Sequence, residues 1–202
     1  MGKTIMLYHT NTRHPVFLKK KSDSKLMRLI GWVLSPFTAT FMERFWTTIG
    51  HTIYTPTRYD NDSTWGSEDW LAAHPLTVEH EVTHVRRNEA WSLPVVAVVY
   101  LGPSAYIAPV ALGLLLTPWL FGWSWVAPIV VWHVAVLLAP LSIGLAYGRW
   151  YIEREAYLVQ VRGRTDPGER ERVIAWIADS LWDNYLWTWP RSAMRRWLKE
   201  NA

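Results

Sequence analysis

Charged side chains are absent from one long part of the chain, residues 90–148, which contains no Asp, Glu, Lys or Arg and a single histidine. The remaining residues carry all 21 basic and all 17 acidic side chains. The stretch divides into two arms, 93–117 and 124–147, and each arm is long enough to cross a hydrocarbon core of about 30 Å as a helix. The pattern therefore predicts a two-helix apolar hairpin over residues 93–148. A transmembrane hairpin is the favoured interpretation, and a hairpin deeply buried in a protein assembly is the alternative.

Tryptophan, which favours membrane interfaces, gathers at both ends of this hairpin. Three Trp lie at the turn between the arms and one lies near each outer end (Trp119, Trp123, Trp125, Trp91 and Trp150). A hairpin returns the chain to the side from which it departed, so the segments before and after it are expected on one membrane face. Basic pairs such as Arg86–Arg87 and Arg195–Arg196 assign that face, with both termini, to the cytoplasm. We expect no signal peptide, because residues 1–25 lack an apolar core.

Shorter patterns in the first third of the chain predict strands and small helices. Residues 3–8 and 46–55 are rich in β-branched, apolar and aromatic side chains, and each run predicts a strand. Residues 29–42 are apolar but too short to span a bilayer, which indicates a packed or interfacial helix interrupted near Pro36. Residues 56–75 form a polar loop with an Asp-x-Asp spacing. A plain turn is favoured there over a calcium loop, because the required Gly and bidentate Glu are missing.

A longer helix is predicted immediately before the hairpin. Thr77 is a suitable N-cap, and the helix is expected to run to about Trp91. Val78, Val82 and Val85 recur on it at helical spacing, so one face of this helix should pack against a core.

The segment after the hairpin also predicts helices. One is expected over 149–161, and Asp166-Pro167 begins another by the N-cap and first-turn proline rule. The tail, 173–199, is amphipathic and suits a membrane surface or a partner protein. The resulting fold class is α+β and mainly helical, with short antiparallel strands packed on a metal-binding helix and an apolar helical hairpin. The expected organisation is an N-terminal part over 1–92, the hairpin over 93–148, and C-terminal helices over 149–202.

Composition removes several classes of function. There is no cysteine, which excludes a disulfide framework, a thiol nucleophile and a cysteine-ligated metal. The formal net charge is +4, an excess too small and too scattered to indicate nucleic acid as a partner.

The motif that carries chemistry is His80-Glu81-Val82-Thr83-His84. Residues four apart share one face of a helix, so both imidazoles can reach a single metal ion while Glu81 projects beside it. Neutral imidazole suits Zn²⁺, and the adjacent carboxylate is then the general base that accepts a proton from a zinc-activated water. A zinc peptidase site needs a third protein ligand. No cysteine exists and no histidine follows closely, so glutamate is the leading type.

At this point the sequence resembles the gluzincin class of zinc metallopeptidases, in which a Glu on a later helix completes the HExxH site. The downstream pattern of the class is Glu-x-x-Ala/Ser-Asp, and this chain has Glu153-Arg154-Glu155-Ala156-Tyr157. When Ala156 is aligned with the Ala/Ser position of the class pattern, the resemblance implies Glu153 as the third ligand, with Glu155 as the competing candidate. Tyr157 stands where the class carries an Asp that orients a metal-bound His.

The resemblance covers residues 46–92 and 149–160. In such enzymes the strand before the active helix binds substrate along its edge, and that strand here carries His51 and Tyr54. His51 and Tyr157 are candidates for stabilising a transition state. His133, inside the second apolar arm, is either a ligand, a proton relay or a structural histidine.

Two functions from different classes follow. The first is a zinc-dependent, membrane-associated metallopeptidase that hydrolyses peptide or protein substrates. The second is a non-catalytic protein, stabilised by zinc, that belongs to a larger assembly such as a viral particle and uses the hairpin as an anchor. A membrane protein with a chance motif and no metal is the third reading.

Overall fold

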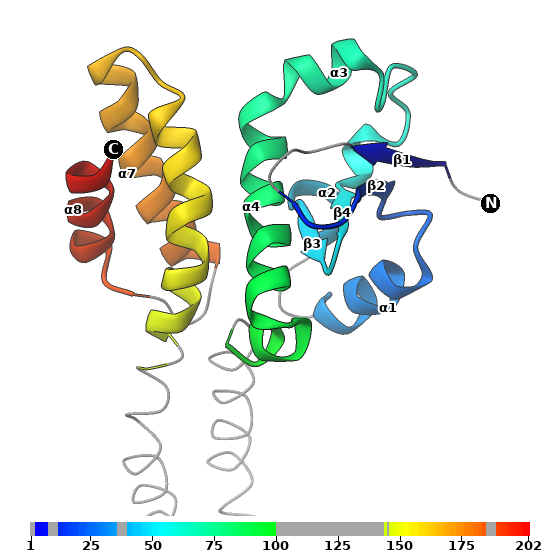
Figure 1. Cartoon of the computed structure of the whole chain (residues 1–202), viewed down its shortest axis with the longest axis horizontal. Helices are drawn as coiled ribbons and strands as arrows, with labels where there is room; N and C mark the ends of the chain where they lie inside the picture. Colours follow the sequence, from blue (N-terminus) through cyan, green and yellow to red (C-terminus); the bar gives the residue numbers. More distant parts are fainter. Residues whose placement is uncertain (1–2, 8–11, 36–39, 100–143, 145, 185–188) are drawn as a thin grey trace, which may run out of the picture. The chain divides into compact units, whose positions relative to one another are not determined.

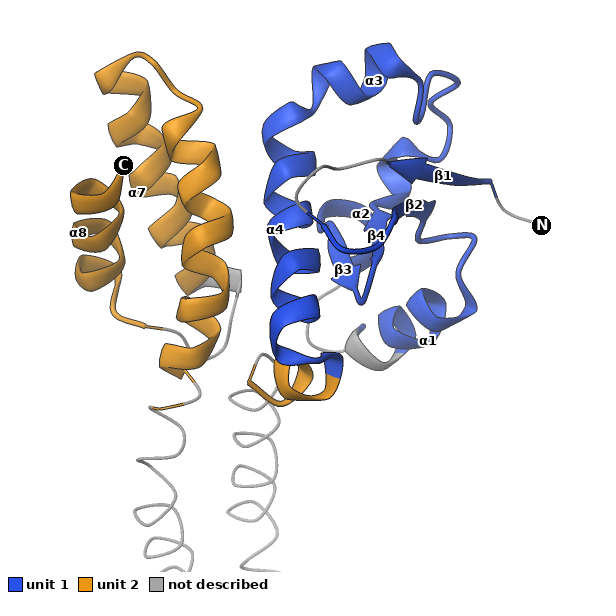
Figure 2. Cartoon of the chain, viewed as in Figure 1, with its two compact units in different colours: residues 1–93 blue, residues 94–202 orange. Residues whose placement is uncertain are grey.

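A computed structural model describes residues 3–7, 12–35, 40–99, 144, 146–184 and 189–202 (Figure 1). The chain divides into two compact units, Met1–Leu93 and Pro94–Ala202 (Figure 2). Each unit has its own hydrophobic core. Helices predominate over one small sheet, which confirms the expected α+β, mainly helical class.

The first unit contains a four-stranded mixed sheet in the order β1-β2-β4-β3. Its strands are β1 (Thr4–Leu7), β2 (Val16–Lys20), β3 (Thr47–Ile49) and β4 (Thr52–Thr55). The β1/β2 and β3/β4 pairs are antiparallel, whereas β2 and β4 pair in parallel. The expectation of antiparallel strands is therefore wrong for the central pair, because the segment between β2 and β4 is long enough to return the chain in the same direction.

Two strands of this sheet differ from the sequence prediction. The run 46–55 is not one strand but a tight hairpin, because Gly50 adopts a positive φ of 57° and reverses the chain. Strand β2 ends in a run of three lysines, Lys19–Lys21, and was not predicted. Its side chains alternate between buried and half-buried, and Val16 and Leu18 are completely buried.

The helices of the first unit are α1 (Lys25–Leu34), α2 (Phe41–Arg44), α3 (Glu68–Ala73) and α4 (Pro75–Trp91), with a 3₁₀ turn η1 (Thr57–Tyr59). The apolar run 29–42 thus contributes to two helices, and residues 36–39 lie outside the described part. The predicted loop 56–75 holds η1 and α3, and Ser67 caps α3 by accepting a hydrogen bond from the Trp70 N–H at 3.1 Å.

Helix α4 begins two residues before the predicted N-cap Thr77, because Pro75 occupies its first turn. The predicted core face is confirmed. Val82 and Val85 are completely buried, and Val78 packs against the same cluster. The cluster joins α4 to the central strands through Val16, Leu18 and Ile53 and to the preceding loop and helix through Trp65 and Trp70. This packing holds α4 firmly against the sheet (Figure 1).

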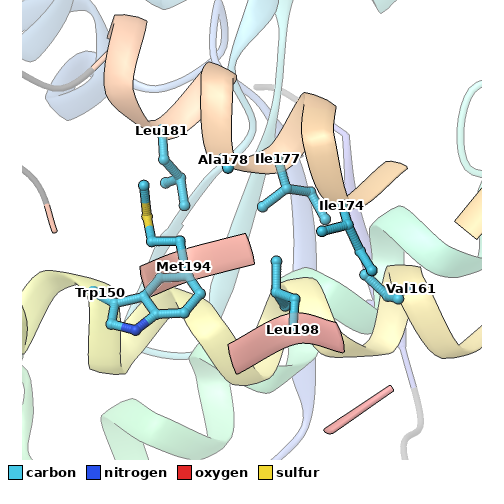
Figure 3. Packing of buried hydrophobic residues seen from close by; sticks show 8 residues of the cluster. All are labelled: Trp150, Val161, Ile174, Ile177, Ala178, Leu181, Met194 and Leu198. Atoms are coloured by element: carbon cyan, nitrogen blue, oxygen red, sulfur yellow. The ribbon is translucent and has the colours of Figure 1, made fainter. Parts of the chain in front are cut away.

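The described part of the second unit after the uncharged stretch consists of a helix over residues 146–162, α7 (Pro167–Asn184) and α8 (Arg191–Asn201). Their apolar faces meet in one cluster, drawn in Figure 3. It consists of Trp150, Val161, Ile174, Ile177, Ala178, Leu181, Met194 and Leu198. Asp166 caps α7 as predicted, with its Oδ2 accepting a hydrogen bond from the Glu169 N–H at 2.5 Å. Arg195 of α8 donates to both carboxylate oxygens of Asp179 on α7, at 2.9 and 3.0 Å.

Most of the predicted apolar hairpin, namely residues 100–143 and 145, lies outside the described residues. Across the described ranges, we find no helix that combines the length and the apolar character needed to cross a membrane. The interpretation of residues 93–148 as a transmembrane hairpin therefore stays a prediction.

Candidate metal centre

Helix α4 brings the two histidines of the motif together. The Nε2 atoms of His80 and His84 lie 3.2 Å apart, and the two rings meet edge to face with centroids 4.9 Å apart. His80 is buried, with 6% of its surface exposed, and His84 is half-buried. The α-helical spacing of four residues is the direct cause of this geometry.

The separation of the two nitrogens fits a shared metal ion. Two imidazoles bound to one tetrahedral Zn²⁺ at 2.0–2.1 Å place their nitrogens about 3.3 Å apart. The observed 3.2 Å therefore matches the separation expected for two nitrogens on a common ion. In the absence of an ion, the same distance allows one ring N–H to donate to the other ring, with the direction set by the tautomers.

Glu81 lies between the two histidines in sequence and is itself buried, with 5% of its surface exposed. Its Oε2 accepts a hydrogen bond of 2.6 Å from the hydroxyl of Thr48. Thr48 belongs to β3, an edge strand of the sheet. A hydrogen bond to a charged acceptor is strong and short, so this contact fixes the carboxylate relative to the sheet.

A buried lysine interacts electrostatically with this carboxylate. Lys21 follows β2 directly and is completely buried. Its Nζ donates to the carbonyl of Phe41 at 2.8 Å and lies 3.7 Å from the centroid of the Phe41 ring. Burial lowers the pKa of Lys21 from its ordinary value of 10.5 to about 7, while the charge of Glu81 acts in the opposite direction.

The third-ligand candidates lie on the helix over residues 146–162. Glu153 is buried, with 2% of its surface exposed, whereas Glu155 is exposed. Tyr157 is half-buried and packs against the core of the second unit. His80 and His84 belong to the first unit, and Glu153 belongs to the second.

His51 and Tyr54, which were predicted on the strand before α4, have different neighbours from those of the histidine pair. His51 lies in the turn between β3 and β4, where its Nε2 is 3.3 Å from Oε1 of Glu89 but is not aligned for a hydrogen bond. Its ring meets that of His14 edge to face, with centroids 5.0 Å apart. Tyr54 is half-buried on β4, opposite Thr47 of β3.

Glu89 anchors the segment that precedes β2. Its side chain is 8% exposed and accepts hydrogen bonds of 3.1 Å from the backbone N–H groups of Arg13 and His14. Burial alone raises the pKa of Glu89. The two backbone donors and the neighbouring histidines outweigh it, so the pKa of Glu89 lies below its usual value. His51 therefore belongs to a structural contact between the β3–β4 turn and α4.

Sequence reasoning identified the motif but not the residues that contact its carboxylate or carry charge near it. Thr48 and Lys21 are remote from Glu81 in sequence, and no spacing rule connects them. The one available signal for Thr48 was its place in a β-branched run ahead of the motif helix. His133, which was also a candidate, lies outside the described residues.

No protein-family model, no curated protein and no solved structure matches this chain.

Proposed function

We propose that this protein is a membrane-associated zinc metallopeptidase of the gluzincin type. In this proposal His80, His84 and Glu153 bind Zn²⁺, and Glu81 is the general base for peptide hydrolysis. The observation that carries it is the 3.2 Å separation of the two imidazole nitrogens beside a buried, hydrogen-bonded carboxylate. A pair of solvated surface histidines would have neither the burial of His80 nor the fixed position of Glu81.

The chemistry divides between the ion and the side chains. When bound, Zn²⁺ supplies a Lewis acid and lowers the pKa of a coordinated water to about 7. Glu81 accepts the proton of the attacking water on its carboxylate and later delivers it to the leaving amine. Thr48 holds Oε2 of that carboxylate, so the base keeps one orientation through both transfers.

Burial supports Glu153 over Glu155 as the third ligand. A carboxylate taken out of water is costly unless it is paired or bound to a metal. Glu153 is buried and Glu155 is exposed, so Glu153 gains more from a cation. Two neutral imidazoles and one carboxylate form a common ligand set for catalytic zinc.

The uncharged stretch supports a membrane location. We propose that residues 93–148 insert in a bilayer as a hairpin, with the motif on the cytoplasmic side. His84 precedes Ser92 by eight residues and Glu153 follows Gly148 by five. Both metal-binding helices would therefore stand close to the same membrane surface.

The first test is the metal content of detergent-purified protein, measured by mass spectrometry of the metals. One zinc per chain is expected in the wild type and in Glu81→Gln. His80→Ala and Glu153→Gln are expected to lose it. Glu155→Gln is the matched control and should retain it. If Glu153→Gln retains zinc and Glu155→Gln loses it, Glu155 is the third ligand. If the wild type contains no zinc, the proposal is refuted.

The second test is hydrolysis of a fluorescence-quenched casein by the same preparations. Wild-type protein should release fluorescence in a manner blocked by a zinc chelator, and Glu81→Gln should not. Normal cleavage by Glu81→Gln would refute the assignment of the base.

A second function is favoured by one observation, the environment of Tyr157. The residue that stands at the position of the orienting Asp packs on the helical core instead of offering a carboxylate. A zinc-stabilised, non-catalytic component of a larger assembly fits that feature. For such a protein His80→Ala lowers the melting temperature, whereas Glu81→Gln leaves every measurable function intact.

A further inference from the structure

Helix α1 presents a row of large apolar side chains to solvent. Trp32 is 74% exposed, Leu29 57% and Leu26 47%. These residues are three apart, so they lie along one face of the helix. A single exposed Leu is ordinary on a protein surface, but a contiguous row with a nearly free Trp marks an interaction site.

The row belongs to a firmly held helix rather than to a frayed segment. On the opposite side Met27 is completely buried, and its N–H donates to the capping hydroxyl of Ser24 at 3.3 Å. Gly31 lies against Met42, where an added Cβ would come within 2.7 Å of Cγ. The glycine therefore lets the segment of α2 approach closely, and the outward face of α1 has a fixed shape.

The charges on α1 identify the kind of surface that it fits. Lys25 and Arg28 are exposed beside the apolar row, and α1 contains no acidic residue. Lys and Arg lay their aliphatic stems along apolar surface and keep the cationic head at the rim. Trp and Leu that enter the interface, flanked by Lys and Arg that reach anionic headgroups, are the side chains of a helix lying in a membrane surface.

We propose that the outward face of α1, formed by Lys25, Leu26, Arg28, Leu29 and Trp32, docks on the surface of an anionic lipid bilayer. The apolar row enters the boundary between headgroups and acyl chains, and the two basic residues contact lipid phosphates. This docking requires no metal and no hydrolysis, so it stands or falls separately from the proposed peptidase activity. It would attach the first unit to the membrane at a place other than residues 93–148.

The test uses the absence of cysteine from the whole chain, which allows one fluorophore at one chosen position. Leu29→Cys places an environment-sensitive label within the row. Asn61→Cys is the matched control, because Asn61 is also exposed and precedes α3, which Figure 1 shows well apart from α1 in the first unit. Full-length protein is reconstituted with phosphatidylcholine vesicles, with or without about one third phosphatidylserine. A second set of vesicles carries a nitroxide quencher near the headgroups.

In anionic vesicles the label at position 29 is expected to shift to the blue and to be quenched by the nitroxide lipid, whereas the label at position 61 should do neither. Lys25→Gln and Arg28→Gln, introduced beside the label, should each reduce the ratio of docked to undocked protein about fivefold. Their helix content, read by circular dichroism, should not change because both side chains are exposed.

Two results would overturn the proposal. Equal behaviour of the labels at positions 29 and 61 would show that α1 stays in water. A blue shift at position 29 in vesicles, together with no quenching by the nitroxide lipid, would show that protein rather than lipid covers α1. Zinc content of the same preparations reports separately on the metal site.

Discussion

Replacing the buried Lys21 by Met should change the pH dependence of stability in a calculable way. Lys21 is completely buried, and its pKa is lowered from 10.5 to about 7. Between these two values the unfolded chain binds a proton that the folded chain has lost. Stability therefore rises with pH through this window, and the destabilisation is fully present below pH 7. Met is of similar length and carries no charge, so Lys21→Met removes the linkage.

The magnitude follows from the two pKa values. Each pKa step corresponds to about 1.4 kcal/mol, so charged Lys21 costs roughly 4 to 5 kcal/mol below pH 7. From pH 7 to pH 9 most of the folded protein is neutral at this site and the unfolded protein is still protonated. The wild type should therefore gain about 2 kcal/mol over that interval relative to Lys21→Met.

Urea unfolding at pH 6, 7, 8 and 9, followed by far-ultraviolet circular dichroism, measures this difference. All other ionisable groups are shared by the two proteins, so their contributions cancel in the comparison. Lys25→Met, which removes an exposed ammonium from α1, supplies the baseline for loss of one positive charge. Parallel stability curves for wild type and Lys21→Met would show that the lysine is not desolvated in the folded protein.

Three further changes test the candidate metal site, the contacts of Glu89 and the helical core of the second unit. Thr48→Val removes the hydroxyl that donates to Glu81, and a hydrogen bond to a charged group contributes about 1.5 to 3 kcal/mol. Casein hydrolysis should therefore fall about tenfold or more, while the zinc content of the protein should not change. Glu89→Gln should lower the free energy of unfolding at pH 7 by about 1 to 2 kcal/mol. Because the pKa of Glu89 is lowered in the folded protein, this difference from wild type should disappear only when the pH falls below the ordinary pKa of a glutamate. Urea titrations at pH 7 and pH 3 would detect the change. Ile177→Ala leaves a cavity in the helical core and should cost about 2 to 5 kcal/mol, a loss that calorimetry would register as a lowered melting temperature.

Local signals predicted α4 and α7 well, whereas α3 lies in a segment that was expected to be a loop. The valine spacing identified the buried face of α4, and Asp166-Pro167 marked the start of α7. Both signals act within a few residues, where hydrogen bonding and side-chain direction depend on neighbours in sequence. The only error at α4 was its first turn, where Pro75 begins the helix ahead of Thr77.

The sheet was harder to predict because its determinants are not local. The run 46–55 has uniform β propensity, and only the positive φ of Gly50 converts it into a hairpin. Strand β2 ends within a run of three lysines, a pattern that is more typical of a solvated segment than of a buried strand. Lys21 is nevertheless buried, since its ammonium finds a carbonyl and an aromatic ring supplied by Phe41. Pairing between distant segments decides such cases.

In the candidate site, too, the local contacts could be predicted from the sequence and the contacts between distant segments could not. The spacing of His80 and His84 is enough to bring their rings together on any helix, and the sequence alone predicts that contact. The hydrogen bond from Thr48 to Glu81 depends on how β3 lies against α4, which no spacing within the motif encodes.

The division of the chain at residue 93 affects the order in which its parts are synthesised and can fold. Every strand of the sheet and the whole of α4 precede that boundary, so the ribosome delivers the first unit before the uncharged stretch. Translation proceeds at about 5 to 20 residues per second, whereas small α/β domains fold within milliseconds to seconds. Glu153 follows His84 by about 70 residues and is synthesised roughly 3 to 14 s later. A nascent chain would therefore present a folded histidine pair, able to capture a metal ion weakly, before its proposed third ligand exists.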